Sequence, residues 1–432
     1  MAQADTLTER LARAAYGAVL RLLTPAYLLR LWRRGKAEPL YRHAVGQRLG
    51  LGYESSEPGR LWLHAVSLGE TRAAAPLIDA LRKRQPGLRL LLTHSTATGC
   101  EAGRELLREG DAQTWLPYDT AGAVRRFLRH WQPSVGVLME TEIWPTLQRE
   151  ADRAGVPMVL ANARLSAKSL RQGERFAALM RPAARCLRIA LAQSEADAQR
   201  LRQAGVAEVQ VCGNLKYDLQ PDAALLERGQ RWRAQLARPV VLLAVSREGE
   251  EAPLLAAWAR LPAAGRPLLL IVPRHPQRFD EVAAMVEAHG LRLARRSNWG
   301  DAPAPQAQAA DVWLGDSMRE MPLYYGLADV ALLGGSFEKL GGQNLIEAAA
   351  CGCPLLMGPH TFNFSEAAAL AEQAGAARRV PSLAEAVTMA TGLLAEPGAL
   401  AQQAARARDF AAEHRGAAER MAQALAGRLP QR

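Results

Sequence analysis

A carboxylate follows the first strongly apolar segment of the chain, at Glu70. Residues 61–70 read LWLHAVSLGE, and a stretch rich in alanine, leucine and arginine comes after them. A short apolar run that stops at a glycine turn is typical of a buried parallel strand, so the order is strand, turn, helix. Ligands of open α/β sheets bind at the carboxyl ends of strands, where a glutamate can take a proton from a hydroxyl group. A glutamate in a first helical turn also complements the helix dipole with no catalytic role, and the segment alone fits both interpretations.

Basic side chains follow another apolar run, where residues 271–278 read IVPRHPQR. Arg274, His275 and Arg278 come directly after a predicted strand, and their charges suit a phosphate group. A solvated surface loop would carry the same residue types, so this segment also leaves two interpretations open.

Glycines cluster further on, where residues 331–353 read ALLGGSFEKLGGQNLIEAAACGC. Glycines let a backbone approach a ligand closely, and N–H groups at a helix start favour an anion. The spacing is neither G-x-G-x-x-G nor Walker A, but it indicates a nucleotide-linked ligand. The residues that we expect to contact it are Gly341, Gly342, Gln343, Asn344 and, through ribose hydroxyls, Glu347.

No D-x-D pair occurs in the chain, although many nucleotide-sugar transferases use such a pair to hold a divalent cation. We therefore expect no metal site and no bound cofactor. Arginine and helix-terminal N–H groups would then stabilise a departing phosphate.

These segments need elements that position them. Strand-like and helix-like stretches alternate from residue 60 to 215 and again from residue 240, an order typical of parallel, doubly wound sheets. We predict an α/β protein of two Rossmann-like domains with parallel sheets that face a central cleft. The predicted parts are an amphipathic segment (1–36), an N-terminal acceptor domain (37–215), a linker (216–236), a C-terminal donor domain (237–400) and a C-terminal helix (401–432) that could cross back to the N-terminal domain.

The net charge of +11 over 432 residues points to an anionic partner, such as nucleic acid, acidic lipid or a phosphorylated substrate. The five cysteines are scattered and form no C-x-x-C pair, which argues against a zinc site or a disulfide framework and fits a reducing compartment.

The N-terminal segment, residues 8–36, interleaves leucines and aromatic residues with arginines. Its longest uncharged run, 22–29, contains Pro25 and is far shorter than the roughly 20 apolar residues that span a bilayer. The pattern favours a basic amphipathic helix in a membrane interface. A helix packed on the protein's own domain is the alternative.

Several strings, in this order, resemble one known family closely. They are HAVSLGE (64–70), HSTATG (94–99), LPYD (116–119), ETEIWP (140–145), NARLS (162–166), GNLKYD (213–218), VPRHPQRF (272–279), GGSF (334–337), GGQNLIEAAACGCP (341–354) and MGPHTFNFSE (357–366). Over about residues 15–425 the chain resembles the 3-deoxy-D-manno-octulosonic acid (Kdo) transferases, which add Kdo to the lipid A precursor in lipopolysaccharide biosynthesis.

The resemblance implies an inverting, metal-independent GT-B glycosyltransferase that uses CMP-Kdo as its donor substrate. It implies that Glu70 is the general base and that Glu140 and Glu142 line the acceptor side. It implies that Arg274 and the turn 341–344 hold the CMP phosphate, with His275 beside them, that Glu347 contacts the ribose and that Asn363 lies near the donor. Candidates to pair with the Kdo carboxylate are Arg72, Arg164 and Lys216.

The resemblance further implies two partners, the lipid A precursor and the cytoplasmic face of an anionic inner membrane, and no nucleic acid. The chain departs from the family pattern at Val245-Ser246-Arg247-Glu248, where a Gly-Ser-Thr-His-like turn is usual, at Gln343, where a histidine is frequent, and at Lys339-Leu340. The alternatives are another GT-B enzyme, a transferase or epimerase that uses a UDP-sugar, and a non-catalytic protein that binds anionic lipid.

Overall fold

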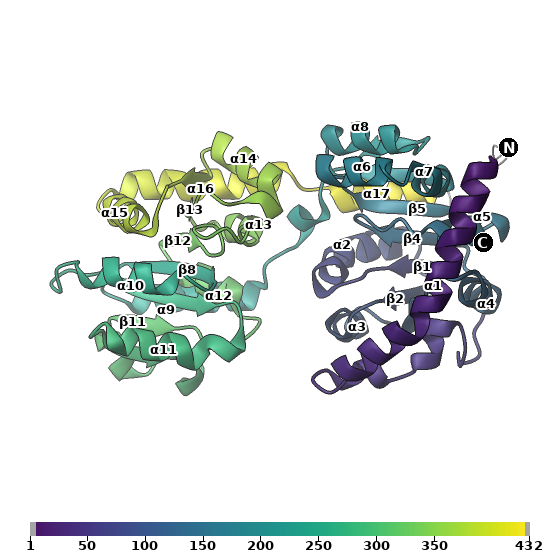
Figure 1. Cartoon of the computed structure of the whole chain (residues 1–432). Helices are drawn as coiled ribbons and strands as arrows, with labels where there is room; N and C mark the ends of the chain where they lie inside the picture. The colour runs from purple at the N-terminus through teal and green to yellow at the C-terminus, as the bar shows by residue number, and fades with distance from the viewer. Residues whose placement is uncertain (1–5, 428–432) are drawn as a thin grey trace. The chain divides into compact units, whose positions relative to one another are not determined.

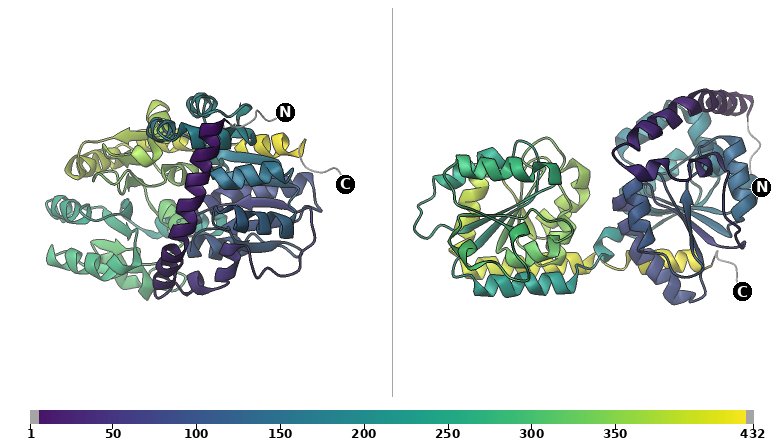
Figure 2. Two further views of the ribbon diagram at one scale, coloured as in Figure 1. Left: turned by 45° about the vertical axis from the view of Figure 1, so that its right-hand side comes forward. Right: turned by 90° about the horizontal axis from the view of Figure 1, so that it is seen from below.

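The computed structural model describes residues 6–427, which form two compact α/β units. Unit 1 comprises Met1–Leu219 and Arg415–Arg432, and unit 2 comprises Gln220–His414. In each unit, helices cover both faces of a parallel sheet of seven strands (Figures 1 and 2). The outermost residues of two predicted parts, 1–5 and 428–432, lie outside the described range.

The sheet of unit 1 has the strand order β3-β2-β1-β4-β5-β6-β7, and every pair is parallel. Apart from the exposed Arg188 of β6, its inner strands are buried because helices pack on both faces, which explains their apolar runs. The order reverses between β1 and β4, the topological switch point at which α/β sheets bind ligands. The strands are β1 (Leu61–His64), β2 (Leu90–His94), β3 (Ala112–Trp115), β4 (Val135–Met139), β5 (Met158–Ala163), β6 (Leu187–Ala192) and β7 (Val209–Val211).

The helices of unit 1 bury two apolar clusters, one on each face of the sheet. The last helix of the chain completes one cluster, because its Met421 and Leu425 pack with Leu77 and Leu81 of the first helix after β1. The helices are α1 (Leu7–Arg34), α2 (Leu68–Arg84), α3 (Ala97–Arg104), α4 (Ala121–Trp131), α5 (Pro145–Arg153), α6 (Ala167–Glu174), α7 (Ala177–Arg185), α8 (Glu195–Ala204) and α17 (Ala417–Ala426), with 3₁₀ turns η1 (Pro39–Arg42), η2 (Val45–Leu49) and η3 (Leu215–Asp218).

Helix α1 runs for 28 residues along the surface of unit 1 (Figure 1). It begins at a capping box, in which Thr6 and Glu9 bond each other's backbone, and only Leu31 of the helix is buried. None of the helices in residues 6–427 is both long and apolar enough to span a membrane. The exposed large apolar side chains of α1 are Leu7, Leu11, Val19, Leu22, Leu23, Tyr27, Leu29 and Trp32.

The sheet of unit 2 has the order β10-β11-β9-β8-β12-β13-β14 and is also parallel throughout, with its switch point between β8 and β12. The strands are β8 (Val240–Ser246), β9 (Leu268–Pro273), β10 (Leu293–Arg295), β11 (Val312–Leu314), β12 (Val330–Leu333), β13 (Leu355–Met357) and β14 (Ala377–Arg379). The helices are α9 (Ala223–Gln235), α10 (Glu251–Ala259), α11 (Phe279–Ala288), α12 (Met321–Leu327), α13 (Leu345–Ala350), α14 (Ser365–Gln373), α15 (Leu383–Leu394) and α16 (Pro397–Glu413), and the 3₁₀ turns are η4 (Pro276–Arg278), η5 (Arg296–Asn298), η6 (Pro305–Ala309) and η7 (Phe362–Phe364).

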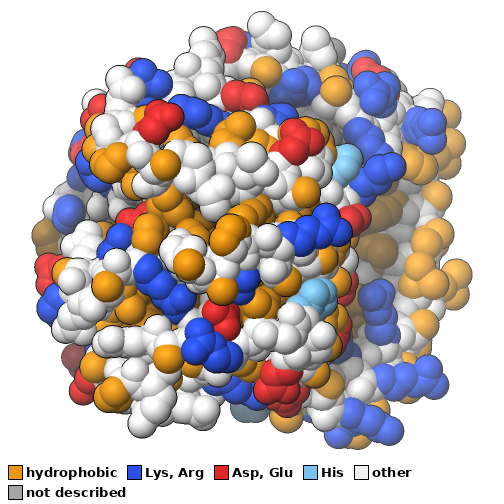
Figure 3. Space-filling model, turned by 90° about the vertical axis from the view of Figure 1, so that its left-hand side faces the viewer, with side chains coloured by type: hydrophobic (Ala, Val, Ile, Leu, Met, Phe, Trp, Pro, Cys, Tyr) orange, Lys and Arg blue, Asp and Glu red, His pale blue; other side chains and the backbone are white. Residues whose placement is uncertain are grey.

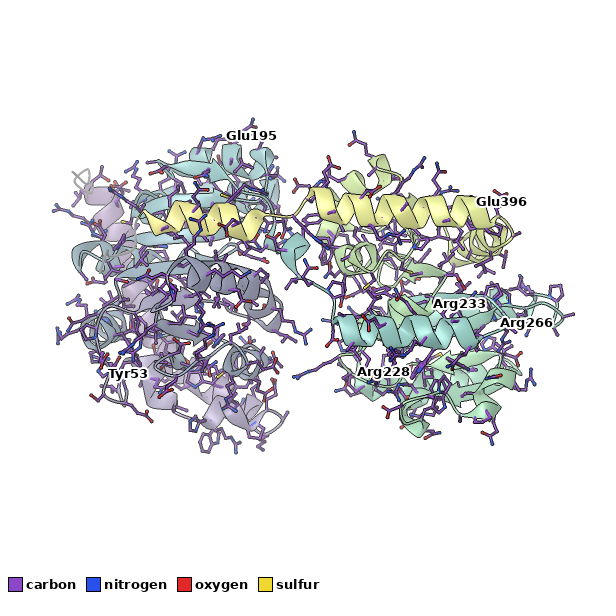
Figure 4. All side chains as sticks on the ribbon, turned by 180° about the vertical axis from the view of Figure 1, so that it is seen from behind. Tyr53, Glu195, Arg228, Arg233, Arg266 and Glu396 are labelled. Atoms are coloured by element: carbon purple, nitrogen blue, oxygen red, sulfur yellow. The ribbon has the colours of Figure 1, made fainter. Side chains whose placement is uncertain are left out.

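Most of the stretch 216–236, which the sequence assigns to a linker, is the packed helix α9 of unit 2. Helices α9 and α12 approach closely through glycine, since a Cβ on Gly229 would lie 2.1 Å from the carbonyl oxygen of Leu323. Arg233, labelled on α9 in Figure 4, donates from Nε to Asp329 at 2.7 Å. The polar sequence of this stretch is typical of a linker, but the tertiary contacts make it helical.

The sequence did not predict the short strands β3, β10 and β14 because each has too few apolar residues to stand out. On the face of unit 2 that Figure 3 presents, Lys and Arg side chains alternate with acidic and apolar ones and form no continuous basic stripe.

Candidate active site

Glu70 lies in the first turn of α2, directly after β1 and next to the switch point of unit 1. Ser67 is the N-cap of α2, and its hydroxyl donates to Glu70 Oε1 at 3.1 Å. The backbone N–H of Val66 donates to Glu70 Oε2 at 2.8 Å. These two contacts aim the half-buried carboxylate back at the end of β1, the position that the sequence predicts for a base.

Glu140 follows the last residue of β4, on the other side of the switch point. It is buried and has a left-handed backbone, with φ 57°. Its carboxylate pairs with two cations, Arg164 directly after β5 (Nε to Oε2, 3.0 Å) and Lys216 in η3 (Nζ to Oε1, 3.5 Å). Two of the three candidates for the Kdo carboxylate therefore neutralise Glu140, whereas Arg72 is exposed on α2.

Glu142 lies two residues further, in the loop before α5. The indole Nε1 of Trp144 donates to its Oε2 at 2.6 Å. Burial raises the pKa of Glu142, and the nearby charge of Glu140 raises it further. The segment Glu140–Trp144, which we call the acidic turn, thus holds one carboxylate by ion pairs and the other by a hydrogen bond.

The electrostatics of the site favour a neutral Glu70 more than the sequence alone suggests. Burial is the main cause that raises the pKa of Glu70, from 4.5 to about 7, and the charges of Glu140 and Glu142 add to it. The hydrogen bonds from Val66 and Ser67 lower the pKa but do not outweigh burial. A carboxyl group with this pKa exchanges protons near neutral pH.

Two histidines beneath the site were missed as candidates, although both stand in the quoted strings. His64 Nδ1 lies 2.9 Å from Thr93 Oγ1, and His94 Nδ1 lies 3.0 Å from the carbonyl oxygen of Ala65. Burial lowers the pKa of His64 to about 3 and that of His94 to about 4, so both rings are neutral at pH 7. They join β1 to β2 immediately before the turn that carries Glu70.

In unit 2, the glycine-rich segment after β12 is fastened to the end of β8 by Glu250. This buried carboxylate accepts from the N–H groups of Arg247 (2.9 Å), Gly335 (2.7 Å) and Phe337 (3.1 Å). These bonds cross the switch point between β8 and β12. Glu250 therefore positions both the turn that follows β8 and the turn that follows β12. Sequence reasoning missed Glu250, because a glutamate before a helix carries no signal of a contact 85 residues away.

The second glycine pair contacts the segment that contains Asn363. Gly341 (φ 90°) and Gly342 (φ 75°) both have left-handed backbones, and a Cβ on Gly341 would lie 2.4 Å from Asn363 Nδ2. The Asn363 amide donates to the Leu340 carbonyl at 3.0 Å, and its backbone N–H donates to the Gly341 carbonyl at 3.0 Å.

The other predicted donor residues lie at the start of α13. Asn344 caps α13, on which Glu347 lies half-buried, and Gln343 lies beside Gly335. The structure thus gathers the predicted residues of this segment on one loop pair.

The basic segment after β9 divides into exposed and buried members. Arg274 and His275 are exposed, and the Arg274 N–H donates to the carbonyl of Ser246 at 3.0 Å, which places them beside the end of β8. Arg278 is buried and forms a bidentate pair with Glu251, at 2.6 and 3.1 Å. Of the two interpretations of this segment, neither describes Arg278, because its guanidinium is committed to a buried carboxylate.

The departure at Val245 has a structural consequence. Val245 has a left-handed backbone (φ 60°), a conformation that costs a β-branched residue more than a glycine.

In residues 6–427, no group of three or more Asp, Glu, His and Cys side chains is arranged to hold a metal ion.

The family described as 3-deoxy-D-manno-octulosonic-acid transferase (kdotransferase) matches residues 43–219. The 3-deoxy-D-manno-octulosonic acid transferase of Bordetella pertussis is 46% identical over 428 residues, which cover 96% of this chain and 99% of that protein. This chain belongs to the Kdo transferase family. The Haemophilus influenzae Kdo transferase is 32% identical, covering 96% of this chain and 98% of its own.

Membership makes the protein a glycosyltransferase with Kdo transferase activity and confirms the resemblance read from the strings. Among solved structures, the UDP-GlcNAc 2-epimerase of Neisseria meningitidis has a TM-score of 0.56 and 14% identity, covering 86% of this chain and 99% of its own. The glycotransferase of kitacinnamycin has a TM-score of 0.54 and 16% identity, covering 87% of this chain and 100% of its own. These likenesses confirm the GT-B fold. The UDP-sugar alternative shares that fold only, whereas the family of this chain is Kdo transferase.

Proposed function

We propose that this Kdo transferase moves Kdo from CMP-Kdo to a hydroxyl group of the lipid A precursor, with inversion at the anomeric carbon and without a metal ion. The observation that carries the proposal is the environment of Glu70. It is half-buried at a switch point, oriented by Val66 and Ser67, and has a pKa near 7.

In the proposed reaction, Glu70 takes the proton of the acceptor hydroxyl as its oxygen attacks the anomeric carbon of Kdo. The new C–O bond forms as the bond from that carbon to the CMP phosphate oxygen breaks, and CMP leaves with the electron pair. A single displacement inverts the anomeric centre. General-base assistance of this kind is typically worth about 10²- to 10⁴-fold in rate. The acidic turn would contact the acceptor through Glu142, since Glu140 is already paired.

The donor residues belong to unit 2. We propose that Arg274 and His275 contact the phosphate of CMP-Kdo together with the backbone of 341–344, and that Glu347 contacts the ribose and Asn363 the donor sugar. Fixed cationic and N–H donors stabilise the charge that develops on a leaving phosphate, each worth about 3 kcal/mol in a site that excludes water. Glu250 would position this loop pair without contacting the donor.

We propose that α1 lies in the interface of the inner membrane on its cytoplasmic side, where the lipid acceptor is found. The support is the row of exposed leucines and Trp32 on a helix that also carries several arginines. The net charge of +11 suits lipid phosphates, and we expect no nucleic acid to bind.

The test is incubation of the full chain with CMP-Kdo and the tetra-acylated lipid A precursor, followed by mass spectrometry of the lipid. The expected product carries added Kdo, and a parallel reaction in EDTA gives the same yield. A UDP-sugar in place of CMP-Kdo serves as the control and gives no product. Absence of a Kdo-bearing lipid would overturn the proposal, and a loss in EDTA that Mg²⁺ restores would overturn its metal-free part.

A further inference from the structure

Helix α1 is joined to the body of unit 1 by a partly buried hydrogen bond. The hydroxyl of Tyr16, near the middle of α1, donates to Asp119 Oδ2 at 2.9 Å. Asp119 is buried in the loop between β3 and α4, more than a hundred residues away along the chain. The ring of Tyr27, three turns further along α1, packs edge-on against the neighbouring Tyr118, with ring centroids 4.4 Å apart. Two successive residues of the LPYD segment are thus held by one helix.

The carboxylate of Asp119 also caps a different helix. Its Oδ1 accepts from the N–H of Leu147 at 2.6 Å and its Oδ2 from the N–H of Thr146 at 3.0 Å. N–H groups in the first turn of a helix have no acceptor within that helix, and the N-cap residue of α5, Trp144, accepts no hydrogen bond through its side chain. The cap of α5 is therefore supplied from a distant segment, and one oxygen of that cap also receives the hydroxyl of Tyr16.

Helix α5 begins where the acidic turn ends. Trp144 connects the two, because it precedes Pro145 of α5 and donates its indole N–H to Glu142 at 2.6 Å. A shift of the first turn of α5 would move Trp144 and with it the carboxylate of Glu142. The contacts thus run without a break from Tyr16 through Asp119 and Trp144 to Glu142.

We propose that Tyr16 and Asp119 are positioning residues, through which the docking of α1 on unit 1 holds the acidic turn in the geometry that receives the acceptor. The inference rests on the proposed function, since it takes Glu142 as part of the acceptor side. Neither residue touches the reacting atoms. Their role is to make acceptor binding depend on the seating of the helix that carries the exposed apolar side chains.

The test compares two full-length variants that each lose one hydroxyl from α1. Tyr16→Phe removes the bond to Asp119 and keeps the ring. Thr24→Val is the matched control, because the Thr24 hydroxyl donates to the carbonyl of Leu20 within its own helix, at 2.7 Å. In Tyr16→Phe we expect the KM for the lipid acceptor to rise about fivefold, with the KM for CMP-Kdo unchanged, as suits the loss of one partly buried hydrogen bond to a positioning carboxylate.

A second measurement does not depend on activity. Amide hydrogen exchange of the peptide that contains Thr146 and Leu147 should accelerate in Tyr16→Phe and stay at the wild-type rate in Thr24→Val. If exchange, or the acceptor KM, is the same in the two variants, the inference is wrong. If wild-type protein transfers no Kdo to the lipid, the proposed function fails instead, and the exchange comparison still decides whether Tyr16 supports the cap of α5.

Discussion

Arg164 Nε lies 3.0 Å from Glu140 Oε2, so a carboxylate and a cation that the sequence assigned to opposite substrates bind each other. Lys216 adds a second positive charge to the same carboxylate. The pairing reduces the repulsion that Glu140 exerts on Glu70. Among residues 6–427, no cation is paired with Glu142, the other acidic side chain of this turn.

This relationship makes a prediction for Arg164→Gln. With less positive charge beside Glu140, the repulsion on Glu70 grows, and the pKa of Glu70 rises. The acid limb of the pH profile of kcat/KM should move upward by about 0.3 of a pH unit, a small shift because Arg164 is half exposed. Arg202→Gln, which removes an exposed arginine paired with Glu195 in the same unit, is the control and should leave the profile in place. A profile that moves downward in Arg164→Gln would contradict the pairing.

Glu70→Gln should fold normally and lose at least about a hundredfold in kcat, because an amide cannot accept the acceptor's proton. Steady-state transfer assays with both substrates saturating measure the loss. Glu385→Gln is a matched control, since Ser382 and Glu385 form the same N-terminal cap on α15 as Ser67 and Glu70 do on α2. Nearly unchanged turnover in Glu70→Gln would rule out its role as the base.

The raised pKa of Glu70 also predicts how activity and stability depend on pH. Activity should rise with pH up to about 7, as Glu70 ionises. Between pH 4.5 and about 7 the folded state binds this proton more tightly than the unfolded state, so this carboxyl group's contribution to stability falls as pH rises. Glu70→Gln should therefore be more stable than wild type at pH 8, by roughly 1–3 kcal/mol, and should lose this advantage near pH 4. Urea unfolding at both values measures the difference, and equal stability at pH 8 would mean that the pKa is not raised.

Val245→Gly should stabilise unit 2. Glycine removes the steric cost of the left-handed backbone, which outweighs its larger entropy in the unfolded chain, and the net gain is about 1 kcal/mol. Val211→Gly, in a strand residue with no positive φ, should instead destabilise the protein. Thermal unfolding of the two variants checks the sign of each. Destabilisation by Val245→Gly would show that the valine side chain contributes more than its strain removes.

Substitution of Arg274 and of Arg278, which are four residues apart, should have different effects: the first on donor binding and the second on stability. Arg274→Gln should raise the KM for CMP-Kdo about tenfold and leave stability unchanged, as expected for an exposed contact with the donor phosphate. Arg278→Gln should destabilise unit 2 by about 3–5 kcal/mol, because it leaves Glu251 buried without its cation. Arg260→Gln, at an exposed arginine of the same unit, is the control for both. An unchanged KM in Arg274→Gln would remove Arg274 from the proposed donor site.

Much of the candidate site follows from local sequence. In unit 1, the turn after β1 places Glu70 and the turn after β4 places Glu140 and Glu142. In unit 2, the glycine pair at 341–342 follows β12. Within each sheet, parallel strands bring their carboxyl ends to one edge. These relations depend on the order of strand, turn and helix, which hydrophobic periodicity reveals.

Contacts between distant segments could not be predicted in the same way. Glu250 holds Gly335, Arg278 pairs with Glu251, and Asp119 caps α5 and receives Tyr16, yet none of these side chains differs in type from its exposed counterparts. Stretch 216–236 was misjudged for a similar reason, since its helix is stabilised by close packing on α12.

The amino-acid sequence by itself determined the α/β class, the family and the order in which the chemically important turns occur, because these depend on short-range patterns along the chain. Only the tertiary structure decided which carboxylates are paired and which keep their protons near pH 7. Those properties depend on burial and on charges from other strands. For Glu70, burial prevails over the hydrogen bonds of the helix start, a balance that becomes visible only when the sheet and its neighbouring turns are in place.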